Sequence, residues 1–367
     1  MRIIYFSLDY TPHDHRFLSA LSQTEHQVFY VRLQHGPRQT EARPVPERIE
    51  QVLWEGGRDV FRWRDAPRYV RGLRRIIKRI RPDLIHAGPI QTCAFIAVLT
   101  GFRPILTMSW GFDLMKDDTR SRWWTWVTRY TLRRSTWFTS DAQVTRDKAV
   151  AYGMNPERTV VFPWGVDLDH FKPKDWSANE GEGFTVLCNR SWEPNYGVDV
   201  VARAFVKAAQ QREDISLMLL TGGSLSGLIR EILIQGGVDE LVTFPGFVRN
   251  DDLPRFYHMA DLYVSASHVD GSSVSLMEAL ACGLPCAVSD IPANREWVTD
   301  GINGWVFRDG DIDALAGIIL KAVEQKTSLP VIGQNAHKTA EEKANWPSNF
   351  GKLLEAYENA CKLAKVK

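Results

Sequence analysis

Short apolar segments alternate with helix-length amphipathic segments along nearly the whole of this 367-residue chain. The strand-like segments are 3–7, 28–31, 83–86, 105–109, 185–188, 217–221, 242–244, 262–265 and 286–289. The helical patterns that stand out are 16–22, 67–81, 92–100, 311–324 and 348–365. Alternation of this kind is typical of parallel sheets whose crossover helices bury both faces. We therefore predict an α/β chain built from doubly wound sheets.

One stretch interrupts the alternation. Residues 162–184 are rich in Pro, Gly and charge, which is typical of an interdomain linker. The chain is also too long for one ordinary core. We predict an N-terminal domain over 1–165, a linker over 166–183, a C-terminal domain over 184–345, and a final helix over 346–367 that packs back on the first domain. Because open parallel sheets bind ligands at the carboxyl ends of their strands, both domains should present those ends to one shared cleft.

The formal net charge of +1 hides two halves of opposite sign. Residues 1–172 hold 27 Lys and Arg against 18 Asp and Glu, and the remainder holds 18 against 26, so the two halves should have different partners. The five cysteines lack metal-ligand spacing and mostly lie in apolar runs, which favours buried free thiols in a reducing compartment. With no leader pattern and no uninterrupted apolar span, we expect a cytoplasmic protein.

The most informative segment is 264–292, VSASHVDGSSVSLMEALACGLPCAVSDIP. It predicts a strand, a turn of small polar residues and a helix, so that the backbone amides of residues 272–274 would form an anion site at the helix start. Asp270 in the turn and Glu278 on the helix can accept hydrogen bonds from the vicinal hydroxyls of a sugar or ribose. An alternative is a capping box between Ser275 and Glu278 that follows an ordinary turn.

An acidic residue, seven residues, a glutamate and then Ala-Leu-Ala-x-Gly-x-Pro resembles the nucleotide-sugar signature of glycosyltransferase family 4, the group 1 glycosyltransferases. Residues 165–171, 243–267 and 287–307 resemble further parts of the family. The resemblance covers the C-terminal domain and is weaker over the first 150 residues. It implies the GT-B fold, with two Rossmann-like domains facing an interdomain cleft. It also implies a retaining, metal-independent hexosyltransferase that uses a UDP or GDP sugar as donor and no cofactor.

The resemblance implies that Glu278 binds the ribose hydroxyls. Asp270, which is shorter than the family's usual Glu, would hold hydroxyls of the donor sugar and act in catalysis. Gly222 resembles a small-residue turn beside the nucleotide, although an ordinary strand exit explains it nearly as well. The implied contacts to the diphosphate and the rest of the nucleotide are Gly271, Ser272, Ser273, Val274, Gly222 and Val248.

Arg190 stands at the end of the strand 185–188, where a rigid fork of donors can neutralise a leaving diphosphate. The alternative is a surface ion pair with Glu193. The family usually places a phosphate-binding Lys six residues after this Arg, and this chain has Tyr196 instead. The implied mechanism ionises the bond between the anomeric carbon and the phosphate while the acceptor attacks from the same face. A departing phosphate oxygen takes the proton, so no protein base is obligatory.

The N-terminal half departs from the family pattern. Residues 7–18, SLDYTPHDHRFL, stand where many members have a glycine-rich loop. The candidate acceptor-side residues in this segment are His13, Asp14, His15 and Arg16. The spacing of the two histidines alone does not favour a metal site, and we expect none.

A second departure follows the strand 105–109. Trp110 takes the position where the family often has a His, and its side chain cannot exchange protons. Asp113 is the nearest residue that can orient an acceptor hydroxyl, and the alternative for it is a helix N-cap.

Two segments of the basic half suggest a membrane partner. Residues 68–81 hold seven basic and no acidic residues, and residues 120–137 combine five Arg with Trp123, Trp124, Trp126 and Trp137. Arg and Trp on amphipathic helices suit the headgroup region of an anionic membrane. The apolar stripe of 68–81 is better explained by packing on the sheet. Our hypothesis is peripheral contact with the cytoplasmic face of the inner membrane and a lipid-linked or cell-envelope glycan as acceptor.

Other functions stay open. A soluble glycosyltransferase would use a small-molecule acceptor, and a GT-B nucleotide-sugar 2-epimerase would need acid–base carboxylates and histidines at the sugar. A nucleic-acid-binding protein would explain the basic half but would leave the acidic pair without a role, so we expect no nucleic acid partner.

Overall fold

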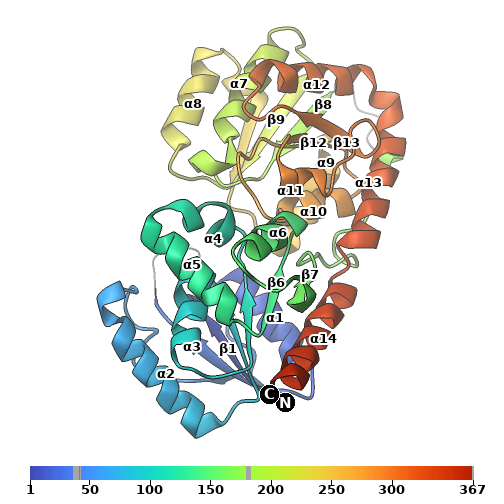
Figure 1. Ribbon diagram of the computed structural model, residues 1–367. Coiled ribbons are helices and arrows are strands. Elements are labelled where there is room, and N and C mark those ends of the chain that lie inside the picture. The colour runs from blue at the N-terminus through green and yellow to red at the C-terminus, as the bar shows by residue number, and fades with distance from the viewer. Residues whose placement is uncertain (36–40, 42, 179–182, 366–367) are drawn as a thin grey trace. The chain divides into compact units, whose positions relative to one another are not determined.

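The computed structural model describes residues 1–35, 41, 43–178 and 183–365, and it divides into two compact units (Figure 1). Unit 1 comprises Met1–Phe162 and Phe350–Lys367, and unit 2 comprises Pro163–Asn349. Most of the stretch predicted as a linker belongs to unit 2, where the Val166 amide donates to the Ala344 carbonyl at 2.8 Å. Residues 179–182 of that stretch, and 366–367 of the predicted final helix, lie outside the described residues.

Unit 1 is built on a seven-stranded parallel sheet with the order β3-β2-β1-β4-β5-β6-β7. Its strands are β1 (Arg2–Ser7), β2 (Gln27–Arg32), β3 (Glu50–Gln51), β4 (Leu84–Gly88), β5 (Ile105–Met108), β6 (Trp137–Ser140) and β7 (Thr159–Val161). Its helices are α1 (Pro12–Ser22), α2 (Ala66–Ile80), α3 (Phe95–Leu99), α4 (Phe112–Met115), α5 (Arg122–Arg134), α6 (Gln143–Ala151) and most of α14 (Trp346–Lys365).

Both faces of the first sheet are covered, because its strands carry apolar residues on both sides. On β1, Ile4 and Phe6 pack with residues of α2 and α3. Tyr5 points to the opposite face, where its ring contacts Phe17 of α1 and His86. This arrangement explains the nearly continuous apolar strands of the sequence.

Helix α1 begins earlier than the pattern 16–22 predicts. Thr11 is the N-cap, Pro12 takes the first helical position, and the Asp14 side chain accepts from the Thr11 amide at 2.9 Å to complete a capping box. Residues 12–18, which stand in place of a glycine-rich loop, therefore form the first turns of a helix.

Unit 2 is built on a six-stranded parallel sheet with the order β10-β9-β8-β11-β12-β13. Its strands are β8 (Phe184–Cys188), β9 (Ile215–Leu220), β10 (Val242–Gly246), β11 (Leu262–Ser265), β12 (Cys286–Ser289) and β13 (Gly304–Phe307). Its helices are α7 (Val198–Ala209), α8 (Ser226–Gln235), α9 (Leu253–Met259), α10 (Val274–Ala281), α11 (Pro292–Arg295), α12 (Ile312–Glu324) and α13 (Leu329–Lys343).

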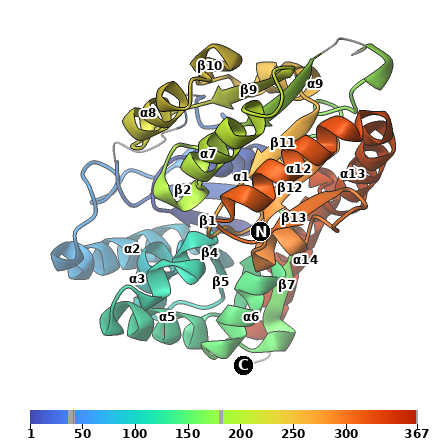
Figure 2. The same ribbon diagram turned by 90° about the horizontal axis from the view of Figure 1, so that it is seen from above.

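Two apolar clusters cover the two faces of the second sheet. On β9, Leu217 and Leu219 join a cluster with residues of α7, α8 and α12, and Met218 and Leu220 join a cluster with residues of α9, α10 and α13. Helices α7 and α12 lie side by side over the first of these faces (Figure 2). The sequence patterns did not single out α13, whose mean hydropathy is close to neutral.

The cysteines are free thiols, and four of the five are buried. No helix in the described part of the chain is both long enough and apolar enough to cross a bilayer.

Candidate functional site

The order of strands in unit 2 brings two distant segments to one place. Strands β8 and β11 are neighbours, with Tyr263 paired to Leu187, although their sequence positions are far apart. The strand order reverses between them, which is where doubly wound sheets bind ligands. Arg190 follows β8 and Asp270 follows β11, so both side chains lie at the carboxyl end of the sheet.

Arg190 is held by three side chains around the start of α10. Its Nη1 atom donates to Ser273 Oγ at 2.6 Å and to Ser275 Oγ at 3.1 Å, and its Nη2 atom pairs with Asp270 Oδ2 at 2.5 Å. The guanidinium also stacks on the Tyr196 ring, 4.2 Å from its centroid. The ion pair of Arg190 is therefore with Asp270.

The surface pair between Arg190 and Glu193, which the sequence left open, is not formed. Glu193 instead accepts hydrogen bonds from the Ser224 amide and hydroxyl, at 3.1 and 2.6 Å.

The start of α10 differs from the capping box that the sequence allowed. The N-cap is Ser273, whose hydroxyl accepts from the Leu276 amide at 3.3 Å. Ser275 lies inside the first turn and turns its hydroxyl to Arg190 and to Tyr263. Because Ser273 and not Ser275 caps α10, the capping-box interpretation of the Ser275–Glu278 spacing is wrong.

Glu278 is buried on α10, with 4% of its surface exposed. Its Oε2 atom lies 2.8 Å from the hydroxyl of Tyr257 on α9, which also lies 3.2 Å from the Ser275 carbonyl. Asn189, next to Arg190, donates to the same Tyr257 hydroxyl at 2.6 Å. Tyr257 thus links the two segments, and no motif of the sequence pointed to it.

Arg190 is the one positive charge among the side chains described above. Burial lowers the pKa of Arg190, but Asp270, together with Tyr263, Tyr196 and Cys188, raises it by more in sum, so the guanidinium stays charged. Its Nε atom is buried and has no hydrogen-bond partner among the residues that the structure describes. An unsatisfied buried donor costs about 1–3 kcal/mol. A charged guanidinium beside a helix N-terminus is an arrangement that can bind phosphate oxygens.

The remaining residues predicted for the donor also lie in unit 2, where each makes contacts of its own. The Gly271 amide is bonded to Asp270 Oδ1 at 3.0 Å, and Ser272 Oγ lies 3.4 Å from the Trp297 indole nitrogen. The Gly222 carbonyl accepts from the Trp192 amide at 2.9 Å. Residues Val274 and Val248 are half-buried and pack against the cluster formed with α9, α10 and α13.

The predicted acceptor-side residues lie in unit 1. Trp110 packs against His13, with ring centroids 5.8 Å apart, and a Cβ on Gly88 would lie only 2.6 Å from the Trp110 indole nitrogen. Burial, with a smaller effect of Arg16, lowers the pKa of His13 to about 3, so this ring is neutral at physiological pH. His15 shares a 2.7 Å hydrogen bond with the Tyr10 hydroxyl. Among the described residues, no cluster of His, Cys, Asp and Glu could hold a metal ion.

Asp113 is buried, and groups of the protein occupy both of its carboxylate oxygens. Oδ1 accepts from Ser109 Oγ at 2.6 Å and from the Trp110 amide at 3.1 Å, and Oδ2 accepts from the Ile90 amide at 3.0 Å. Burial raises its pKa to about 6 against the opposing effect of these hydrogen bonds. The N-cap of α4 is Gly111, so Asp113 is not that cap. It ties the end of β5 to the start of the π-helical segment Ile90–Ala94, which leads into α3.

Two family models match consecutive parts of the chain. "Glycosyltransferase Family 4" matches residues 13–170, and "Glycosyl transferases group 1" matches residues 171–339.

Curated relatives match a little over half of the chain. A GDP-mannose-dependent alpha-(1-6)-phosphatidylinositol monomannoside mannosyltransferase of Mycobacterium tuberculosis is 24% identical over 53% of this chain and 54% of its own length. A D-inositol 3-phosphate glycosyltransferase of Geodermatophilus obscurus is 28% identical over 57% of this chain and 49% of its own length. The chain thus spans about half the length of the curated relatives it matches.

Solved structures match nearly the whole chain in shape. Anabaena HepE, in complex with UDP, gives a TM-score of 0.77 at 16% identity and covers 98% of this chain and 100% of its own. Sucrose-phosphate synthase of Thermosynechococcus elongatus gives a TM-score of 0.79 at 16% identity, with 98% of both chains covered. With the two parallel sheets, this likeness shows that the fold is α/β of the GT-B type, as predicted.

Proposed function

Since this chain belongs to glycosyltransferase family 4, the group 1 glycosyltransferases, we propose that it moves a hexose-type sugar from a nucleotide-diphosphate donor to an acceptor hydroxyl. The observation that carries the proposal is the placement of Arg190 at the start of α10, between Ser273, Ser275 and Asp270, with a buried Nε donor to spare. This group can hold the diphosphate that a donor sugar leaves behind.

In the proposed complex, Glu278 accepts hydrogen bonds from the ribose and Asp270 from the sugar. The nucleotide is UDP or GDP. HepE structures with UDP and with UDP-glucose support the first, and the GDP-mannose-dependent relatives support the second.

The proposed reaction retains the configuration of the sugar. The bond between the anomeric carbon and the phosphate oxygen breaks, and its electron pair leaves with the diphosphate. The acceptor oxygen bonds to the anomeric carbon on the same face, and its proton passes to the departing phosphate oxygen. Arg190 and the amides at the start of α10 stabilise the charge that develops on the leaving group. These groups supply positive charge without a metal, so we propose metal-independent transfer.

Asp113 is left out of this mechanism because its carboxylate oxygens already accept hydrogen bonds from Ser109, Trp110 and Ile90. For His13, His15, Arg16 and Trp110 we propose only that they contact the acceptor, and we assign them no step of the reaction.

The experiment that tests the function mixes the chain with a panel of UDP and GDP sugars and a set of glycan, glycolipid and small-molecule acceptors. Released nucleotide that depends on the acceptor, with the anomeric configuration of the product retained by NMR, supports the proposal. Epimerised donor without nucleotide release would favour the 2-epimerase. Activity that persists with a chelator supports transfer without a metal.

Tyr196 is expected to position the Arg190 guanidinium through its ring. Tyr196→Phe keeps the stacking face and should leave transfer within about twofold of wild type, whereas Tyr196→Leu should lower kcat about 2- to 30-fold through the lost cation–π contact. The two variants are compared by kcat and KM for the donor. A Phe variant as slow as the Leu variant would show that the hydroxyl, and not the ring, matters.

We also propose that unit 1 contacts an anionic membrane surface and that the acceptor is lipid-linked or a cell-envelope glycan. The support comes from α5, where Trp123 and Trp126 are 50% and 48% exposed and stack on each other among arginines. The apolar stripe of α2 does not contribute, because Val70, Leu73 and Ile80 are buried against the sheet. Trp137, which the sequence grouped with these residues, begins β6.

Vesicle flotation tests the membrane proposal. We expect wild type to float with vesicles that contain phosphatidylglycerol and to stay behind with pure phosphatidylcholine or at high salt. Trp123→Ala with Trp126→Ala should abolish most of the flotation, since both rings lose interfacial contact. Ile234→Ala, which removes an exposed apolar side chain from α8 in unit 2, is the control and should float normally. Wild type that fails to float at low salt would remove the proposal.

A further inference from the structure

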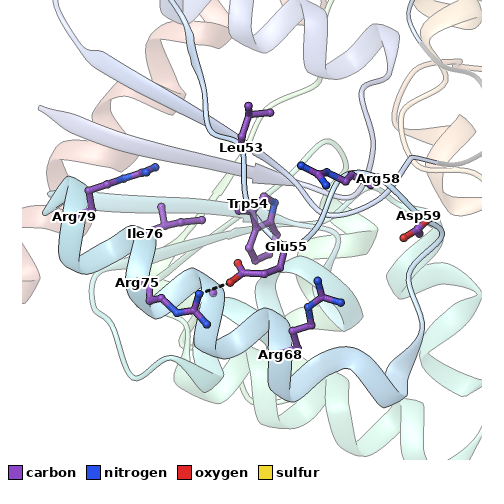
Figure 3. A pocket seen from close by; sticks show the side chains of 10 residues that line it. Leu53, Trp54, Glu55, Arg58, Asp59, Arg68, Arg75, Ile76 and Arg79 are labelled. Atoms are coloured by element: carbon purple, nitrogen blue, oxygen red, sulfur yellow. Dashed lines mark hydrogen bonds and ion pairs between the residues drawn. The ribbon is translucent and has the colours of Figure 1, made fainter.

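A hollow of about 580 Å³ lies in unit 1 between residues 53–59 and helix α2, separate from the donor site (Figure 3). Figure 3 shows the side chains of the loop on one side of it and those of α2 on the other. The lining residues that carry charge are four arginines and two acids: Arg58, Arg68, Arg75, Arg79, Glu55 and Asp59.

The positive charge of this hollow is only partly neutralised. Arg75 pairs with Glu55 at 2.5 Å. Arg58, Arg68 and Arg79 have no hydrogen bond or ion pair to any residue that the structure describes. The hollow is thus lined by four guanidiniums, one from residues 53–59 and three from α2, and by only two carboxylates.

The arginines of α2 divide into two groups with different roles. Arg74 donates to the carbonyls of Leu99 and Thr100, and Arg71 donates to the Pro67 carbonyl, so these two are used by the fold. Arg75 and Arg79 line the hollow one turn apart, where like charges repel. A bound anion would relieve that repulsion.

Trp54, which lines the hollow, is held in place by the residues around it. The Trp54 indole nitrogen donates to the Arg32 carbonyl at 2.7 Å, and its ring packs against Phe6 and Tyr69. Gly72 also lines the hollow, and a Cβ there would lie only 2.3 Å from Glu55 Oε2. The absence of a side chain at Gly72 lets Glu55 reach Arg75 and keeps the hollow open.

We propose that this hollow binds the phosphate group of a phosphate ester. Guanidinium forks that approach from two elements suit a tetrahedral dianion, whose three free oxygens can each accept hydrogen bonds, better than a planar carboxylate. Leu53 lines the same hollow with 86% of its surface exposed, which provides an apolar contact for the organic part of the ester. The ester can be soluble or the head group of a lipid. The inference does not rest on the proposed transfer, because every donor-site residue lies in unit 2.

The test compares two double variants of the full chain that lose the same charge from the same helix. Arg68→Gln with Arg79→Gln changes residues that line the hollow, and Arg71→Gln with Lys78→Gln changes residues that do not. Binding of glycerol 3-phosphate is measured by calorimetry at low ionic strength, and binding to phosphatidylcholine vesicles with and without phosphatidic acid by sedimentation. Circular dichroism checks that both variants fold.

We expect the first double variant to bind at least about tenfold more weakly than wild type, and the second to stay within about threefold. Such a loss in the calorimetric arm would show that the hollow binds a soluble phosphate ester. A loss confined to the vesicle arm would show that it binds the head group of a lipid. Equal weakening of both variants in both arms would show diffuse attraction by α2 and overturn the proposal. Wild type that binds neither probe would also overturn it.

Discussion

Replacing Arg190 with Gln is expected to lower kcat for sugar transfer by about 100- to 1000-fold, the usual effect of removing a donor that stabilises developing negative charge. Gln is shorter than Arg and carries no charge. The guanidinium that pairs with Asp270 and bonds to Ser273 and Ser275 is then lost, and the leaving diphosphate meets only amides and hydroxyls. Initial rates at saturating donor and acceptor measure the effect.

Arg190→Lys separates charge from geometry. Lys restores one positive charge but cannot reach the two serines and Asp270 at once, so we expect a rate between those of wild type and Arg190→Gln. Arg203→Gln, on the exposed face of α7, is the control for loss of an arginine in unit 2 and should transfer sugar at the wild-type rate.

Arg190→Gln also leaves the half-buried Asp270 without its ion-pair partner, and the resulting loss of stability would itself reduce activity. Arg190→Gln with Asp270→Asn removes both charges together and leaves a neutral amide at each position, so a melting temperature close to that of wild type is expected. If the double variant folds normally and still transfers sugar at the wild-type rate, Arg190 has no role in the reaction.

The sequence predicted unit 2 well because its signals are local. Alternation of apolar residues placed the strands, and a small-residue turn before a helix placed Asp270 and Ser273 at a helix start. Arg190 followed from its position after a strand. The sequence could not predict that β8 and β11 are neighbours, since strand order depends on how the crossover helices pack. Tyr257 was missed for this reason, because its link to Glu278 and Asn189 arises only when α9 packs beside α10.

Unit 1 was harder to predict because burial decides what its polar residues do. Asp113 has the residue type of a catalytic group or a helix cap, yet it accepts hydrogen bonds from Ser109, Trp110 and Ile90. The bond from Ile90, at the start of the π-helical segment Ile90–Ala94, joins residues far apart in the sequence and has no local signal. The pattern 16–22 placed the start of α1 too late, although Thr11 and Asp14 have the spacing of a capping box and Pro12 suits the first helical position. The arginine-lined hollow needs residues 53–59 to fold back over α2, a contact that periodicity cannot show.

Glu278→Gln is expected to remove the thermal protection that nucleotide gives to this chain. In the proposed complex both oxygens of Glu278 accept hydrogen bonds, from ribose hydroxyls and from Tyr257. An amide retains one acceptor and presents an NH2 group where a hydroxyl donates. Loss of charged hydrogen bonds worth about 1.5–3 kcal/mol each weakens binding about 10- to 100-fold or more. At a nucleotide concentration about ten times the wild-type Kd, the stabilisation by nucleotide should then fall from about 1.4 kcal/mol to about 0.4 kcal/mol or less.

Melting curves with UDP and with GDP make the measurement, and the nucleotide that shifts wild type also identifies the donor base. Glu342→Gln, an exposed change on α13, is the control and should show the full shift. Tyr257→Phe keeps the carboxylate and removes one of its partners, so a smaller loss of protection is expected than for Glu278→Gln. Because Glu278 is buried and its Tyr257 partner can still donate to the amide oxygen, the variant should melt near wild type without nucleotide. An undiminished shift in Glu278→Gln would mean that the ribose lies elsewhere, even if Arg190 proves essential.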